Sequence, residues 1–115
     1  MKVVFLLYED EQVWAAASAA ERSRYMVQHD EFAAFLRERG TLEAAEALST
    51  VSAATTVRRR GGDVVVTEGP YAELTEQLGG FYLANLPSID TAIEAVALLP
   101  QYTVELRPVV DVDDL

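Results

Sequence analysis

The sequence predicts a single α+β domain, and three observations favour this class. The chain has 115 residues, the size of one domain. Apolar residues make up 50% of it and charged residues 24%, the composition of a globular protein with one hydrophobic core. Short runs typical of strands alternate with two longer segments of helical period. The resulting order of strand, helix, hairpin, strand, helix and strand is the ferredoxin-like split βαβ arrangement with a β-hairpin inserted in its first half.

The first strand and the first helix have clear signals. Residues 3–8 form a short apolar run rich in β-branched and aromatic side chains, typical of a strand covered on both faces. Ser18 and Glu21 form a capping box, which predicts that a helix begins here. Gly40 is predicted to end this helix as its C′ residue. The apolar stripe of the helix contains Tyr25, His29, Phe32, Ala33 and Leu36.

The middle of the chain predicts a hairpin. Residues 41–53 are small and indicate no definite element, so a turn of helix and irregular chain both remain open. The β-prone runs Thr55–Arg59 and Val64–Thr67 flank residues 60–63. The Gly-Gly pair within that short connection is typical of a hairpin turn.

The last third of the chain predicts a strand, a helix and a strand after a short helical segment. Residues 72–78 are expected to form this segment, closed by two glycines, and residues 81–85 to form a strand. A second helix follows Ser88 and ends before the next proline. Residues 102–107 alternate between apolar and polar side chains, which predicts the final strand. The stripe of the second helix is Ile89, Ala92, Ile93, Val96 and Leu99.

Charge and composition exclude several classes of function. Nine Lys and Arg against nineteen Asp and Glu give a formal net charge of −10, which disfavours nucleic acid and anionic membranes as partners. The absence of Cys excludes disulfides and thiolate chemistry. The basic residues 58–60 are therefore expected to form a solvated rim. Glu9, Asp10, Glu11 and Asp30 lack the spacing of metal ligands, so we expect a solvated acidic face, no metal and no cofactor.

The N-terminal segment does not predict export. The apolar run within Met1–Tyr8 is shorter than the about 7–15 residues of a signal peptide, and no cleavage site follows it. No stretch approaches the roughly 20 apolar residues of a membrane span. A cytoplasmic location is therefore the expectation.

A homodimer is predicted from the two faces of the sheet. In the split βαβ arrangement the helices cover one face only, and the other face must meet solvent, a ligand or a partner. The strands at 3–8, 64–66 and 81–84 are apolar on both sides. Leaving the second face in water costs about 25 cal/mol for each Å² of apolar area, whereas two packed sheets bury it and enclose a space. The alternative is a monomer whose second face is covered by residues 41–53.

The candidate catalytic residues are His29 and Glu68. His29 is the one histidine of the chain and falls in the apolar stripe of the first helix, where at least one ring nitrogen must find a partner. It is either a core histidine bonded to a backbone carbonyl or an acid–base group lining a pocket. Glu68, at a strand end beside a turn, is either a solvated turn residue or the carboxylate that orients the imidazole.

Several blocks of the sequence resemble a known family. These are Leu6–Glu11, His29 with Phe32, Thr67–Glu73, Glu76–Leu83 and Val104–Pro108. In them the chain resembles the YCII-related proteins, in the branch named for an Asp-Gly-Pro-Phe motif. The similarity runs nearly end to end, so residues 1–115 are identified as one domain of this type.

The resemblance implies a ferredoxin-like dimer of the α+β barrel type. The wider family is thought to include small-molecule enzymes that use a His–Asp pair, with lyase-type elimination assigned to some relatives, and some members occur beside sigma-factor-like regulators. His29 matches the family histidine and Glu68 stands where the motif has aspartate. Tyr71 stands where the motif has phenylalanine.

Two functions follow as hypotheses. The first is a cofactor-free lyase or isomerase, in which His29 moves a proton on a small molecule and Glu68 orients the ring. Here Tyr8, Phe32 and Tyr71 would shape an apolar cavity, and Arg107 would anchor an anionic substrate. The second is a non-catalytic small-molecule-binding or transcription-linked regulatory module. An accessible imidazole with a carboxylate within about 2.6–3.2 Å, or one water away, would favour the enzyme.

Overall fold

A four-stranded antiparallel sheet forms the centre of the protein, as described by a computed structural model of residues 1–115. Its strands are β1 (Lys2–Glu9), β2 (Thr41–Ala47), β5 (Gln77–Asn85) and β6 (Thr103–Pro108). They lie in the order β2-β5-β1-β6, so the first strand of the chain is flanked by two later ones. This order is consistent with the predicted ferredoxin-like α+β fold.

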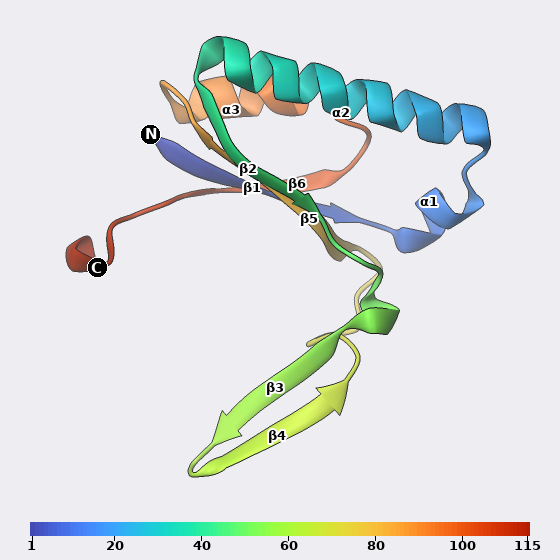
Figure 1. Cartoon of the computed structure of the whole chain (residues 1–115), viewed down its shortest axis with the longest axis vertical. Helices are drawn as coiled ribbons and strands as arrows, with labels where there is room; N and C mark the ends of the chain where they lie inside the picture. Colours follow the sequence, from blue (N-terminus) through green and yellow to red (C-terminus); the bar gives the residue numbers. More distant parts are fainter.

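Helices cover one side of this sheet. Both α2 (Ala19–Arg39) and α3 (Ile89–Val96) lie on that side, and the short α1 (Glu11–Ala16) precedes α2 near one end of the sheet (Figure 1). The capping box is confirmed, since Ser18 Oγ accepts from the Glu21 N–H and Glu21 Oε1 accepts from the Ser18 N–H, both at 3.1 Å. No helix combines the length and the apolar composition needed to cross a membrane.

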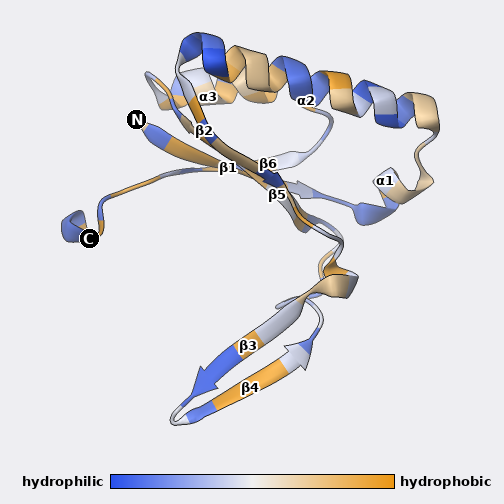
Figure 2. Cartoon of the chain, viewed as in Figure 1, coloured by the Kyte–Doolittle hydropathy of each residue, from blue (hydrophilic) through white to orange (hydrophobic).

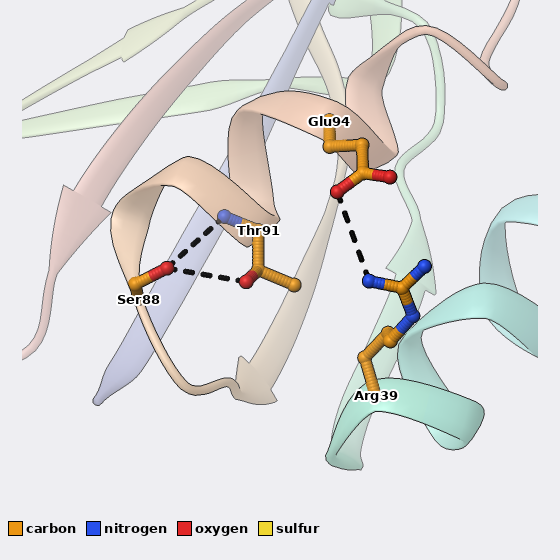
Figure 3. A network of polar contacts seen from close by, with 4 residues as sticks. All are labelled: Arg39, Ser88, Thr91 and Glu94. Carbon is orange, nitrogen blue, oxygen red and sulfur yellow. Dashed lines mark hydrogen bonds and ion pairs between the residues drawn. The ribbon is translucent and has the colours of Figure 1, made fainter.

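Polar contacts cap α3 and link it to the end of α2. Ser88 caps α3, its hydroxyl oxygen accepting from the Thr91 N–H at 3.3 Å and lying 3.1 Å from the Thr91 hydroxyl. Arg39 at the end of α2 lies 3.7 Å from Glu94 of α3 (Figure 3). Because this ion pair is solvent-exposed, it contributes little stability, and apolar packing holds the helices to the sheet.

The hydrophobic core fills the layer between the helices and the sheet. On β1 the side chains of Val3, Phe5 and Leu7 are buried, whereas the intervening residues face the opposite, open side. The rings of Phe5 and Phe32 meet edge to face with centroids 5.1 Å apart. The other buried core residues are Leu36, Ala84, Leu86, Ala92, Ala95 and Leu99.

Several element predictions need correction. Residues 41–47 form the edge strand β2, because pairing with β5 overrides the weak strand propensity of this alanine-rich segment. This segment therefore extends the sheet and does not cover its open face. Residues 72–76 are not helical, and β5 begins at Gln77 because the chain there pairs with β1. The helix α1 was not predicted from the sequence. In α3, Ile93 was predicted to belong to the apolar stripe, but 57% of its surface is exposed and Ala95 is buried instead.

The predicted hairpin is confirmed as β3 (Thr55–Arg60) and β4 (Asp63–Glu68). It extends away from the main sheet, and every residue of β4 is exposed (Figure 1). The valines of β4 form an apolar run beside the basic end of β3 (Figure 2). Gly61 turns the chain at a φ of 60°, a conformation that favours glycine.

Gly40 ends α2 for a reason other than the one predicted. Its φ is −170°, which is extended backbone, so no left-handed C′ conformation is present. A Cβ at this position would collide with the backbone carbonyl oxygen of Asn85 in β5. The end of α2 thus passes so close to the sheet that only glycine fits.

We expect Gly40→Ala to lower the free energy of unfolding by about 2 kcal/mol or more, because the added methyl group meets rigid backbone. Gly62→Ala is the matched control, since a Cβ there meets nothing within 4 Å, and its effect should stay within about 0.5 kcal/mol. Urea denaturation of both variants measures the difference. Equal stability of the two variants would contradict the close approach of α2 and β5.

Candidate functional site

A cavity of about 680 Å³ lies on the helix side of the sheet. It is lined by residues of α2, of α1, of the strands β2 and β5, and of the segment that leads from β2 to the hairpin. Apolar and aromatic side chains make up much of its wall, and His29 lies among them. A volume of this size holds a small organic molecule.

His29 makes two side-chain hydrogen bonds within this wall. Its Nδ1 lies 2.7 Å from the Tyr82 hydroxyl and its Nε2 lies 2.8 Å from the Tyr102 hydroxyl. Tyr82 belongs to β5, and Tyr102 immediately precedes β6, so the ring joins α2 to two strands that flank β1. The partners are side chains that also line the cavity, and neither ring nitrogen bonds a backbone carbonyl.

Burial sets the protonation of all three groups. Desolvation lowers the pKa of His29 below its ordinary value of 6.5, although the nearby Asp30 opposes the shift. Desolvation also raises the pKa values of Tyr82 and Tyr102 above the ordinary 10.0, so both phenols keep their protons at neutral pH. The imidazole is therefore neutral and the two hydroxyls are protonated.

Neutrality of the ring fixes how the protons are arranged. A neutral imidazole has one N–H donor and one acceptor nitrogen. One tyrosine hydroxyl must therefore donate to the ring while the other accepts from it. The accepting hydroxyl still has its own O–H to offer to a molecule in the cavity. We name this arrangement of Tyr82, His29 and Tyr102 the tyrosine–histidine relay.

Glu9 supplies a carboxylate to the same cavity. It follows Val3, Phe5 and Leu7 in the alternation of β1, so its side chain falls on the helix side. Burial raises the pKa of Glu9, and the neighbouring Glu11 raises it further. A Cβ on Gly79 would lie 3.0 Å from Glu9 Oε1, so the absence of a side chain at the β5 bulge makes room for this carboxylate. The expectation of a solvated acidic face is therefore wrong for Glu9.

The predicted site residues other than His29 lie outside this cavity. Phe32 is fully buried and packs against Tyr82, with the two ring centroids 4.7 Å apart. Tyr8 lies on the open face of the sheet, where its hydroxyl donates to Glu105 at 3.3 Å. Arg107 pairs with the same glutamate at 3.8 Å and is exposed.

Glu68 and Tyr71 lie at the base of the hairpin. Glu68 is exposed and is paired along the strand with Thr55. Tyr71 is 80% exposed, with Arg58 5.5 Å from its ring centre. Within one chain the structure does not bring Glu68 to His29, so pairing of the two stays a prediction that requires a second copy.

The sequence contained a signal for the partners of His29. Tyr102 shares the period-two alternation of the last strand with Val104 and Leu106, which places it on the buried side. A buried tyrosine needs a partner for its hydroxyl, and a buried histidine needs partners for its nitrogens. Matching these two needs would have predicted at least one of the contacts. No local sequence pattern indicated that Trp14 lines the cavity or that Gly79 makes room for the Glu9 carboxylate.

The fold and the cavity together define a small α+β protein of ferredoxin-like type with a histidine site between helix and sheet. The family model described as the YCII-related domain matches residues 1–113, and the chain belongs to this family. The chain is also 37% identical over 94 residues to a protein from Rhizobium meliloti (strain 1021) named "Uncharacterized protein R00369". The aligned region covers 82% of this chain and 76% of that relative.

The lowered pKa of His29 predicts a pH dependence of stability. The unfolded chain binds the histidine proton more readily than the folded chain does, so protonation favours unfolding. The contribution of the neutral ring is complete above pH 6.5 and is lost as the pH falls from 6.5 towards the lower pKa of the folded state. Denaturation between pH 7 and 5 should therefore show a smaller loss of stability in His29→Gln than in the unaltered protein.

Nuclear magnetic resonance provides a direct check, because this chain has one histidine and hence one imidazole signal. The midpoint of its titration should lie below 6.5. A midpoint at or above that value would mean that the ring is solvated, contrary to the geometry described.

Proposed function

We propose that this protein is a cofactor-free acid–base catalyst, a lyase or an isomerase, acting on a small molecule held in the cavity. The observation that carries the proposal is the neutral imidazole of His29 bonded at both nitrogens to protonated tyrosines that line a cavity of about 680 Å³. Proton donors and acceptors placed in this way are the groups that general acid–base catalysis requires.

The tyrosine–histidine relay can move a proton without changing its own charge. When Nδ1 carries the ring proton, Tyr82 accepts from it and holds a free O–H, while Tyr102 donates to Nε2. The free Tyr82 proton passes to the substrate, and the ring proton moves from Nδ1 to Tyr82. The Tyr102 proton then moves to Nε2, and Tyr102 takes a proton from the substrate. The net result is one proton removed from the substrate and one returned to it elsewhere, which is an isomerisation.

A lyase uses the same groups in a different way. One end of the relay takes a proton from a carbon of the substrate, and the other end gives a proton to the leaving group. The carbon–hydrogen electron pair forms the new double bond as the leaving group departs. Glu9 provides a carboxylate near Tyr102 as a further proton acceptor. The negative charge of this carboxylate contributes to the raised pKa of the Tyr102 phenol.

We also propose that the protein is a homodimer that packs open face to open face, as an α+β barrel. Val4, Leu6, Phe81 and Leu83 share this face and remain partly exposed in the single chain. The helices lie on the other side of the sheet, and β2 occupies its edge. A second copy packed on this face would bury these side chains.

A specific observation supports a second function, a small-molecule-binding or transcription-linked regulatory module. Both nitrogens of His29 are already hydrogen-bonded, so the ring itself has no free nitrogen for a substrate. If the tyrosines serve only to fix the ring, the cavity binds a ligand without converting it.

Exchange of substrate protons with deuterium distinguishes catalysis from binding. A panel of small ketones and enol lactones is incubated with the protein in D₂O, and deuterium incorporation is followed by mass spectrometry. Catalysis predicts enzyme-dependent incorporation that falls at least about 100-fold in His29→Gln and clearly in both Tyr82→Phe and Tyr102→Phe. Binding of a panel member without incorporation would favour the regulatory module instead.

The dimer has its own test in sedimentation equilibrium. We expect a mass of twice the 12.6 kDa of the chain. Leu6→Glu and Leu83→Glu place a charge on the open face and should shift the protein to the monomer. Val27→Glu is the control, because Val27 is exposed on α2 and does not line the cavity. A monomeric unaltered protein would contradict the proposed assembly.

A further inference from the structure

The charged side chains around the cavity are mostly acidic. Glu9, Glu11 and Asp30 line it, and Arg37 is the one basic residue in the lining. Glu46 is also a lining residue, but the alternation of β2 places its side chain on the open face opposite Phe81. The whole chain has a formal net charge of −10, which adds to the negative potential at the entrance.

Aromatic rings lie beside these carboxylates. The rings of Trp14 and Tyr25 have centroids 5.7 Å apart, and those of Tyr25 and Tyr102 lie 6.4 Å apart, edge to face. All three residues line the cavity. The face of an aromatic ring carries partial negative charge and attracts cations. Trp14 already binds one in this way, because the Arg22 guanidinium lies 4.8 Å from its ring centre although Arg22 is not a lining residue.

From this combination we propose that the cavity selects an organic cation, a primary or substituted amine with an apolar or aromatic body. This deepens the function proposed above and rests on the cavity being the functional site. The ammonium group would lie between Glu9 and the rings of Tyr25 and Tyr102, while the body fills the apolar part of the cavity. Arg107, the predicted anchor of an anionic substrate, does not serve this cavity, because it lies on the open face and pairs with Glu105. Arg37 is the one basic residue available to an anion there, against the three carboxylates of Glu9, Glu11 and Asp30.

Glu9 has the properties of the anchoring group. It is half-buried, no hydrogen bond or ion pair within the chain occupies its carboxylate, and Gly79 leaves space against it. Glu11, in contrast, accepts from the Val51 N–H at 2.9 Å and holds the segment after β2 in place. A cation beside Glu9 would relieve the repulsion between the two carboxylates and compensate the burial of the Glu9 charge.

Three probes of matched shape test the charge preference: 2-phenylethylamine, 2-phenylethanol and 3-phenylpropionate. Trp14 is the one tryptophan of the chain, so quenching of its fluorescence reports binding, with amide chemical shifts as a second readout. We expect the amine to bind at least about tenfold more tightly than the alcohol, and the carboxylate to bind most weakly.

Variants locate the origin of this preference. Glu9→Gln should weaken amine binding about tenfold and leave alcohol binding unchanged. Glu38→Gln removes the same charge from the exposed surface of α2 outside the cavity and should leave both unchanged, which controls for net charge. Thermal unfolding of the two variants confirms that each is folded.

Any one of four results would overturn the proposal. Three concern the probes: equal affinity for all of them, a preference for the carboxylate, or no binding of the amine at millimolar concentration. The fourth is an equal effect of Glu9→Gln and Glu38→Gln on amine binding. These outcomes differ from failure of the proposed catalysis. Absence of deuterium incorporation with the unaltered protein would reject catalysis by the relay and would leave the amine preference intact.

Discussion

The pairing of both nitrogens of the half-buried His29 imidazole with tyrosine hydroxyls shapes the candidate site of this protein. His29 lies on the face of α2 that packs on the sheet, where its half-buried ring lines the cavity. Tyr82 from β5 and Tyr102 before β6 provide the two partners. These hydrogen bonds require a particular placement of α2 over the sheet, because each tyrosine comes from a strand on a different side of β1. A shift of the helix by one turn would break both hydrogen bonds.

The same half-burial explains why the site is a group of neutral donors and acceptors surrounded by charges. Burial keeps the imidazole neutral and the phenols protonated, so the interior of the relay carries no net charge. Charged side chains lie beside the relay in the cavity wall, where Glu9 is half-buried and Asp30 is exposed. In the proposed function the neutral relay passes protons in either direction, and in the proposed selection of a cation the carboxylates favour the ligand. The two proposals thus assign chemistry and selectivity to different residues of one cavity.

Sequence patterns predicted the elements whose local signals agreed with their tertiary role. The capping box at Ser18, the turn of the hairpin and the alternation of β6 are strong local signals and were confirmed. β2 was not recognised because an alanine-rich edge strand forms only through pairing with β5, a contact that is distant in sequence. His29 was identified because a lone histidine in an apolar stripe is conspicuous. Its tyrosine partners were missed because they lie 53 and 73 residues further along the chain, where no spacing rule applies.

The hairpin of β3 and β4 projects from the sheet at the end of a short connection, and its two strands contact mainly each other. None of its residues lines the cavity around His29. Changes in its length or surface would therefore leave the shape of the cavity in a single chain intact. The hairpin surface can therefore vary in evolution independently of the cavity around His29. Homologues with the same cavity can in this way differ in the partners that their hairpins contact.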